Sequence, residues 1–227
     1  MLSDGRKVMS IAPAYNEEGR IAKALDGMPP VVDLSVVVDD GSTDRTAEVA
    51  REYGAHVISL PEHTDLDTAI RTGLEHARSN GFDICVIMAG NGKDDPRQIP
   101  VLLEPIDKAD YDYVQGSRYL SGGEHGKMPL HRAFATRLYP WLLRIFPGFK
   151  ATDGTNGFRA YKTSILSDER IDIYQPWLCR TSLEFYLSIK VMQLGYRVIE
   201  VPVKKIYPQV TDYKQYTKVK PLSDWWN

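Results

Sequence analysis

Short apolar runs alternate with amphipathic segments along the first half of the chain. The runs are rich in Val and Ile and end at clusters of Pro, Gly, Asp or Asn, which is typical of buried β-strands. They predict strands at residues 8–12, 34–38, 55–60, 84–88 and 113–116. Between them, apolar residues recur at helical spacing, and Asn16 is expected to cap the first helix. The predicted helices have inward faces at Ile21, Ala24, Leu25 and Met28; at Thr46, Val49, Ala50 and Tyr53; at Leu66, Ala69, Ile70, Gly73, Leu74 and Ala77; and at Ile99, Leu102, Leu103 and Ile106.

Strands that alternate with helices at this spacing predict an α/β fold. We expect right-handed βαβ units and a mainly parallel, Rossmann-like sheet with helices on both faces. Ligands bind at the carboxyl ends of the strands in such sheets, which selects the loops after Ala12, Val38 and Ala89. The second half is less regular, with helical spacing over residues 130–145, a helix over residues 183–194 and a strand over residues 197–203.

The composition is that of an ordinary globular protein, but the charge is unevenly distributed. The 227 residues are 43% hydrophobic and 26% charged, which excludes fibrous and low-complexity classes. Residues 1–116 hold 11 Lys and Arg against 21 Asp and Glu, whereas residues 117–227 hold 17 against 9. A pI near 6.2 argues against general nucleic-acid binding, while a cationic region beside an acidic one suits a small phosphorylated ligand. Compensating solvated faces are the other interpretation.

The sequence carries no signal for zinc binding, secretion or a membrane span. The two cysteines have no Cys-x-x-Cys spacing, and the five histidines show no His-x-x-x-His spacing. No apolar stretch approaches the roughly 18 residues that cross a bilayer, and residues 1–10 lack an apolar signal-peptide core. We therefore expect a cytoplasmic protein.

Three polar segments fall at the expected ligand edge. They are Pro13-Ala14-Tyr15-Asn16-Glu17, Val38-Asp39-Asp40-Gly41-Ser42-Thr43-Asp44 and Asp153-Gly154-Thr155-Asn156-Gly157-Phe158-Arg159. Together they resemble the inverting nucleotide-sugar glycosyltransferases of the GT-A fold, especially the branch of dolichol-phosphate mannose synthase and related polyprenyl-phosphate glycosyltransferases. The resemblance implies one GT-A domain over residues 1–227. Its nucleotide-binding half is expected at 1–116, and its sugar and acceptor half, with a basic C-terminal segment, at 117–227.

The resemblance implies a nucleotide site at the first two segments. It assigns the base and ribose to Pro13, Tyr15, Glu17, Asp39 and Asp40. Carboxylates suit this role because they accept charge-assisted hydrogen bonds from ribose hydroxyls or a base imide. The alternative is that the second segment only turns the chain and caps a helix, and this structural role is expected of Ser42 and Asp44. Asp39, at the end of the strand, has no evident folding purpose.

The chain departs from the family pattern after the fourth predicted strand. Ala89-Gly90-Asn91 stands where the family has Asp-x-Asp for a divalent metal, and loss of both carboxylates weakens a Mg²⁺ or Mn²⁺ site. Either Asn91, Asp94 and Asp95 rebuild that site, or Asp95-Pro96 starts a helix. A second hypothesis is that the Lys93 ammonium replaces the metal at the departing diphosphate. A solvated loop lysine is the alternative.

Cations and polar groups of the second half complete the expected site. The resemblance places Arg118, Arg132, Arg137 and Lys218 at phosphates or the acceptor, and Asp153 and Asn156 beside the sugar. Arginine forks bind phosphate bidentately, and lysines act as mobile point charges. Surface salt bridges are the alternative for each cation alone, and Arg159 could equally be a buried partner of an acid.

One carboxylate of the last predicted helix is a candidate base. Glu184 stands near the family's catalytic carboxylate, which a hydroxyl acceptor needs and an ionised phosphate acceptor does not. The alternative is an ion pair with Arg180 or another cation. The stretch Trp141-Leu142-Leu143-Arg144-Ile145-Phe146 suits core packing or peripheral contact with the cytoplasmic membrane face near a lipid acceptor.

These residues imply a transferase acting on a nucleotide sugar. The expected reaction moves a sugar with inversion from a nucleotide diphosphate to a phosphate-bearing acceptor, such as a polyprenyl phosphate, or to a hydroxyl. A catalytically silent nucleotide-sugar-binding protein is the alternative, because Ala89 and Asn91 remove the metal carboxylates. A nucleotidyltransferase ranks third, because no Gly-rich phosphate loop follows the first strand.

Overall fold

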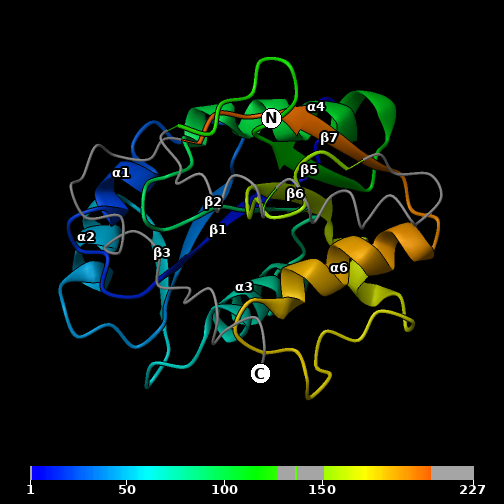
Figure 1. Cartoon of the computed structure of the whole chain (residues 1–227). Helices are drawn as coiled ribbons and strands as arrows, with labels where there is room; N and C mark the ends of the chain where they lie inside the picture. Colours follow the sequence, from blue (N-terminus) through cyan, green and yellow to red (C-terminus); the bar gives the residue numbers. More distant parts are fainter. Residues whose placement is uncertain (1, 127–135, 137–150, 206–227) are drawn as a thin grey trace.

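The fold is built on one mixed sheet with helices on both faces (Figure 1). The computed structural model describes residues 2–126, 136 and 151–205. Within them, the sheet has seven strands in the order β3-β2-β1-β4-β6-β5-β7. The strands are β1 Val8–Ala14, β2 Leu34–Asp39, β3 His56–Ser59, β4 Ile84–Ile87, β5 Tyr113–Ser117, β6 Arg159–Lys162 and β7 Val198–Pro202. The helices are α1 Ile21–Leu25, α2 Thr46–Glu52, α3 Leu66–Ser79, α4 Ile99–Ala109 and α6 Ser182–Gln193, with short 3₁₀ turns at Pro96–Gln98 and Thr163–Ser167.

Strand β6 is the feature that the apolar pattern does not predict. All other pairings are parallel, but β6 runs antiparallel to both β4 and β5, with Arg159 opposite Ile87 and Gln115. Because β6 begins where β4 and β5 end, the residues just before it lie at the carboxyl edge of the sheet. The topology therefore brings the third polar segment to the same edge as the first two.

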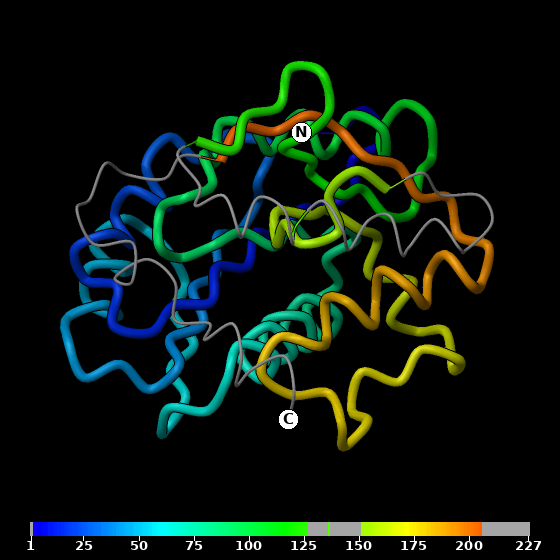
Figure 2. The backbone as a smooth tube through the Cα atoms, in the orientation of Figure 1, coloured from blue at the N-terminus to red at the C-terminus, as the bar shows by residue number. Residues whose placement is uncertain are grey.

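Each face of the sheet has its own apolar cluster. The strands are apolar at consecutive positions because both faces are covered: Val8 and Ala12 of β1 belong to one cluster, and Met9 and Ile11 to the other. Helices α1, α2 and α4 cover the first face, and α3 and α6 the second (Figure 1). The chain start lies beside α4, where Ser3 donates hydrogen bonds to Asp107 (Figure 2).

Some predicted boundaries are wrong. Helix α1 begins at Ile21 with Arg20 as its N-cap, not Asn16. Asn16 has a positive φ of 49°, and its side-chain oxygen accepts the Thr43 N–H, so it links two loops instead. Tyr53 lies just beyond α2 and is 54% exposed. The helix and strand predicted at 183–194 and 197–203 are confirmed with small shifts, and residues 130–145, apart from Thr136, lie outside the described residues.

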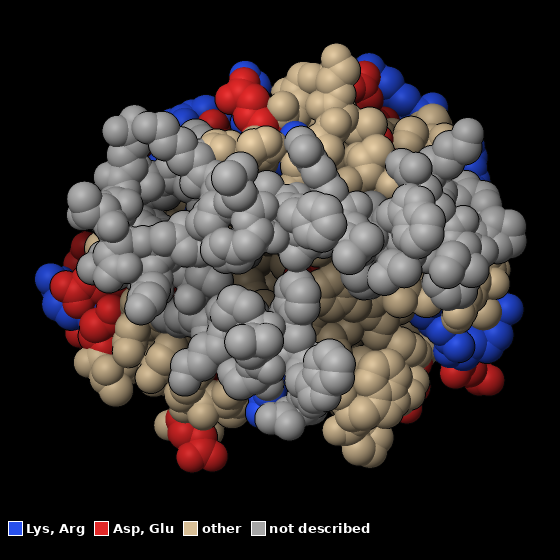
Figure 3. All heavy atoms as spheres, in the orientation of Figure 1, with Lys and Arg blue, Asp and Glu red and all other residues tan. Residues whose placement is uncertain are grey.

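Charge on the surface is locally mixed. Figure 3 shows Lys and Arg interspersed with Asp and Glu around the rim of the visible face. Exposed charges of the described residues often pair, as in Arg45 with Glu48 and Lys108 with Glu104. In the helices that the structure describes, no stretch has both the length and the apolar character needed to cross a bilayer.

Candidate active site

The loops after β1 and β2 are joined by hydrogen bonds. The Asn16 N–H donates to Ser42 Oγ at 2.9 Å, and the Glu17 N–H donates to Thr46 Oγ1 at 2.7 Å. Asp44 accepts hydrogen bonds from Thr46 and from the Glu18 N–H. Partial burial raises the pKa of the Asp44 carboxyl, but these hydrogen bonds outweigh burial and hold the pKa below its ordinary value. The structural roles predicted for Ser42 and Asp44 are confirmed.

The carboxylates predicted to bind the nucleoside come together at this edge. Asp39 ends β2 opposite Ala14, and its Oδ1 accepts the Ser42 N–H at 3.2 Å. Asp39 therefore has a role in folding, and the expectation that it has none is wrong. Glu17 and Asp39 are 6% and 4% exposed. Glu17 Oε2 lies 2.5 Å from Arg20 Nε, so this acid is held by a neighbouring cation.

Asp40 connects this edge to the loop after β3. Its Oδ1 accepts the N–H and hydroxyl of Thr64 at 2.9 and 2.7 Å, and its Oδ2 lies 2.8 Å from His63 Nδ1. The His63 ring stacks on the Tyr15 ring with 3.6 Å between centroids. Gly41 has a φ of +67°, and a Cβ there would lie 2.3 Å from backbone of the facing loop, so this turn requires glycine. A flat aromatic pair in contact with a buried carboxylate suits a nucleoside.

The loop after β4 packs tightly under β1. A Cβ on Gly90 would lie 2.5 Å from the Pro13 carbonyl oxygen, so only glycine fits without movement. The Ala89 N–H donates to Asp94 Oδ2 at 2.9 Å. Lys93 is only 7% exposed, so the interpretation of a solvated loop lysine is wrong.

The carboxylates predicted as metal ligands, Asp94 and Asp95, already make other interactions. Asp95 caps the 3₁₀ turn by accepting the Arg97 N–H at 3.0 Å, which confirms the helix-start alternative. Asp94 Oδ1 lies 2.7 Å from Lys205 Nζ. Asn91 has a buried amide oxygen, but amide oxygen alone supplies no negative charge.

This arrangement does not fit a divalent cation. Mg²⁺ and Mn²⁺ need several anionic oxygens, and the carboxylate nearest to the β4 loop holds an ammonium group instead. Within the described ranges, no group of three or more His, Cys, Asp and Glu side chains is arranged to hold a metal ion.

Arg118 and Asp153 form a buried bidentate ion pair. Arg118 Nε and Nη2 lie 2.6 and 2.8 Å from the two carboxylate oxygens, and the residues are 3% and 0% exposed. Burial disfavours the charged Asp153, but the hydrogen bonds and charge of Arg118 outweigh it and keep the pKa of this carboxyl below its ordinary range. The expected contact of Asp153 with a sugar does not fit this arrangement, because Arg118 occupies both of its carboxylate oxygens. Asp153 instead orients Arg118.

Asn156 lies at the centre of a buried polar cluster. Its Nδ2 donates to the Gly116 carbonyl at 3.0 Å, and its Oδ1 accepts from Lys205 Nζ at 2.9 Å. Lys205 is absent from the site predicted from sequence. Its position two residues after the strand expected at residues 197–203 is the signal that would have found it, because this strand pairs with β5 at the same sheet edge.

Glu184 reaches the site from the first turn of α6. Its Oε2 lies 3.1 Å from the point that a Cβ on Gly157 would occupy. Its Oε1 lies 3.6 Å from Arg159 Nε, so the cation paired with Glu184 is Arg159 and not Arg180. Burial, against the opposing charge of Arg159, raises the pKa of Glu184 above its ordinary value. Asp67 of α3 accepts the N–H groups of Ser182 and Leu183 and so fixes the start of this helix.

Arg159 is a scaffold residue. It is fully buried, and it donates to the carbonyls of Asn156, Glu184 and Gly154 and to the Tyr113 hydroxyl. The interpretation as a buried partner of an acid is confirmed. Three predicted acceptor-side cations, Arg132, Arg137 and Lys218, and the stretch from Trp141 to Phe146 lie outside the described residues.

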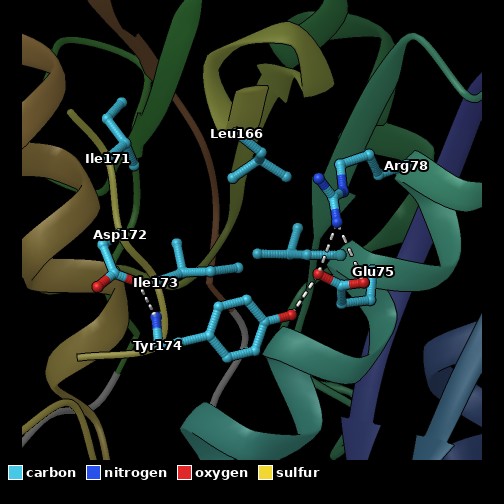
Figure 4. Close-up of a pocket in the computed structure, with 8 residues that line it drawn as sticks. Glu75, Arg78, Leu166, Ile171, Asp172, Ile173 and Tyr174 are labelled. Atoms are coloured by element: carbon cyan, nitrogen blue, oxygen red, sulfur yellow. Dashed lines mark hydrogen bonds and ion pairs between the residues drawn. The ribbon is translucent and has the colours of Figure 1, made fainter. Parts of the chain in front are cut away.

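A separate small pocket lies away from this edge, between α3 and the segment before α6 (Figure 4). Its volume is about 150 Å³. Glu75 of α3 accepts hydrogen bonds from Arg78 of the same helix and from the Tyr174 hydroxyl, and the bond with Tyr174 joins the two walls. Because ligand pockets are typically about 300–1,000 Å³, this space is too small for a nucleoside.

Comparison with known proteins agrees with this geometry. Residues 10–169 match the family model for glycosyl transferase family 2. The undecaprenyl-phosphate mannosyltransferase of Micrococcus luteus is 30% identical over 218 residues, covering 92% of this chain and 87% of that protein. The dolichol-phosphate mannosyltransferase of Pyrococcus furiosus is 35% identical over 209 residues, covering 86% of this chain but only 55% of that protein.

The fold has solved counterparts. Glucosyl-3-phosphoglycerate synthase of Mycobacterium tuberculosis, crystallised with Mn²⁺ and UDP-glucose, aligns with a TM-score of 0.69 and 21% identity, covering 94% of this chain and 74% of that chain. At this identity the likeness establishes the fold alone, and it agrees with the mixed seven-stranded sheet. The chain is a glycosyltransferase with the GT-A fold, and it belongs to glycosyl transferase family 2, in the branch of the polyprenyl-phosphate mannosyltransferases.

Proposed function

We propose that the protein transfers a hexose, with inversion, from a nucleotide diphosphate sugar to a polyprenyl phosphate. The observation that carries this proposal is the meeting of the three polar segments at one sheet edge, which also carries two buried cations, Lys93 in the loop after β4 and Arg118 directly after β5. Relatives named as undecaprenyl-phosphate and dolichol-phosphate mannosyltransferases support the choice of acceptor.

In this proposal the acidic edge binds the nucleoside. Asp39, Asp40 and Glu17 accept hydrogen bonds from ribose hydroxyls and the base, and the stacked rings of Tyr15 and His63 offer an apolar face to the base. The present partners of Asp40 are hydroxyl, amide and imidazole groups, which a ligand hydroxyl can replace without leaving a buried charge unpaired.

The chemical step is an in-line displacement at the anomeric carbon. A phosphate oxygen of the acceptor forms the new C–O bond as the bond to the diphosphate breaks, and the nucleoside diphosphate leaves with the electron pair. Lys93 stabilises the charge that develops on the leaving group, and Arg118, oriented by Asp153, is proposed to attract the acceptor phosphate. Asn156 is proposed to lie on the sugar side.

The acceptor decides whether Glu184 acts as a base. A hydroxyl must lose a proton as it attacks, whereas a phosphate is already ionised. With a polyprenyl phosphate, Glu184→Gln is therefore expected to keep most of its turnover. With a hydroxyl acceptor, the same change is expected to slow transfer about a hundred- to ten-thousandfold.

The same proposal divides the chain by function. Residues 1–116 hold the donor nucleotide, and residues 117–227, including Arg132, Arg137 and Lys218, hold the sugar and acceptor. A polyprenyl phosphate sits in a bilayer, so we propose peripheral membrane contact during turnover. Sedimentation with anionic vesicles, with and without polyprenyl phosphate, tests this part.

The decisive experiment follows labelled sugar from UDP and GDP sugars to polyprenyl phosphate, with polyprenol as the hydroxyl control. We expect transfer to the phosphate and none to polyprenol, and a product of inverted anomeric configuration. Donor binding without transfer or hydrolysis would instead support a silent nucleotide-sugar-binding protein, which no relative named above favours. Transfer to polyprenol alone would contradict the phosphate acceptor.

A further inference from the structure

Lys205 lies within the candidate site although the sequence alone does not assign it there. It follows β7, and its side chain is about nine-tenths buried. Its Nζ lies 2.7 Å from Asp94 Oδ1 and 2.9 Å from Asn156 Oδ1. The ammonium group therefore joins the loop after β4 to the segment before β6.

The ammonium has hydrogen-bonding capacity beyond these two contacts. A lysine ammonium carries three N–H donors in a flexible arrangement, and the two contacts use two of them. The third donor is suited to a strong acceptor, because an unsatisfied charged donor is costly in a buried place. A phosphate oxygen is such an acceptor.

Asp94 fixes this cation at the place where a metal would otherwise be needed. Its second oxygen accepts the Ala89 N–H, so the carboxylate ties Lys205 to the Ala89-Gly90-Asn91 loop. Neither Ala89 nor Gly90 has a side chain able to ligate a metal. The Lys205 ammonium, 2.7 Å from Asp94 Oδ1, would also repel a divalent cation bound beside Asp94.

We propose that Lys205, held by Asp94 and Asn156, binds the donor diphosphate directly and that this site takes the diphosphate without a divalent cation. The proposal rests on the nucleotide-sugar donor of the proposed function and adds the group that receives its phosphates. Lys205 neutralises charge on the leaving diphosphate from a fixed position, so no metal has to be recruited with each donor.

The test is calorimetric binding of nucleoside diphosphate and nucleoside monophosphate, each with the base that binds best, in excess EDTA and then in Mn²⁺. In wild type, we expect the diphosphate to bind equally well in both buffers. Lys205→Met is expected to weaken diphosphate binding about ten- to a hundredfold and to change monophosphate binding little. Lys205→Arg should recover part of the loss.

Two matched variants separate this role from a structural one. Lys204 is the neighbouring exposed lysine, paired with Glu124, and Lys204→Met should leave both affinities unchanged. Asp94→Asn keeps an oxygen acceptor that can hold Lys205 but removes the negative charge beside it, so diphosphate affinity should stay equal or rise. If Asp94 were a metal ligand, the same variant would lose affinity in Mn²⁺.

The possible results distinguish a failure of the proposed function from a failure of the role of Lys205. No binding of any nucleoside diphosphate by wild type would overturn the proposed function together with this inference. Binding that EDTA abolishes and Mn²⁺ restores would overturn the inference alone. Equal losses for monophosphate and diphosphate in Lys205→Met, with a lowered Tm, would make Lys205 a structural tie and nothing more.

Discussion

The two regions of the molecule use charged residues in opposite ways. In residues 2–116, the site acids Asp39 and Asp40 are held by backbone, hydroxyl and imidazole groups at the sheet edge. In the described part of residues 117–205, the charged groups of the third segment are buried against partners outside it, Asp153 against Arg118 and Arg159 against Glu184. The partners of Asp39 and Asp40 are groups that a ligand hydroxyl could replace, whereas Asp153 fixes the geometry of its cation.

This difference shows that a charged residue in a family motif need not touch the substrate. Asp153 carries no exposed surface, and Arg159 donates mainly to carbonyls of its own loop and of α6. Such residues hold in place the parts that do reach the site. Variants of the two regions should therefore differ in whether they lose stability or binding.

The largest effect is expected from breaking the buried pair of the second region. Arg118→Met leaves the Asp153 carboxylate buried without its cation, which should lower the free energy of unfolding by about 3–5 kcal/mol. Urea unfolding measures it. As control, Lys108→Met removes one partner of the exposed pair with Glu104 and should change little. A stable Arg118→Met would contradict the scaffold role of the pair.

A smaller effect is expected where the β4 loop packs under β1. Gly90→Ala places a Cβ 2.5 Å from the Pro13 carbonyl, and this overpacking should cost about 1–3 kcal/mol. Gly19→Ala is the matched control, because its added Cβ meets nothing within 4 Å. Thermal unfolding compares the two. Equal Tm values would mean that the loop moves freely from β1.

The smallest effect concerns the pH dependence of stability. Burial raises the pKa of Glu184 above its ordinary value of 4.5. The positive charges of Arg159 and Lys205 oppose this rise, and the negative charges of Asp67 and Asp94 add to it. The folded state thus keeps this proton where the unfolded chain has lost it. The contribution of protonated Glu184 to the free energy of unfolding is complete below pH 4.5 and is lost as the pH rises through the raised pKa.

Glu184→Gln should remove that loss. Denaturant titrations across this pH window should give the variant a flatter profile than wild type and a stability at neutral pH at least equal to it. The difference between the two proteins isolates Glu184, because Asp67 and Glu200, whose pKa values burial also raises, remain in both. A parallel pair of profiles would show that Glu184 is ionised as in the unfolded chain.

The fold of the first region was predictable because its determinants are local. Apolar runs and helical spacing located β1, β2, β4 and α3, and their parallel order followed from the βαβ rule. Strand β6 was missed because it is short and directly follows a polar motif. The cap assigned to Asn16 was wrong because its side chain bonds Thr43, a contact between two loops.

The site was predictable in its location but not in its pairing. The sequence placed Asp39, Asp40 and Lys93 at the correct edge, since strand ends carry loops whose position topology fixes. It did not predict that Asp153 holds Arg118 or that Asp94 holds Lys205. These pairs join residues 35 and 111 positions apart, and no periodic pattern encodes such partners.

The most direct test of the account is the affinity of the preferred nucleoside monophosphate and diphosphate for wild type and Asp39→Asn, measured by calorimetry. Asp39→Asn removes the charge from an acceptor that is proposed to face the nucleoside and should weaken both ligands equally, by about ten- to a hundredfold. Unchanged affinity for both ligands would contradict nucleoside binding at the carboxyl edge of β1 and β2.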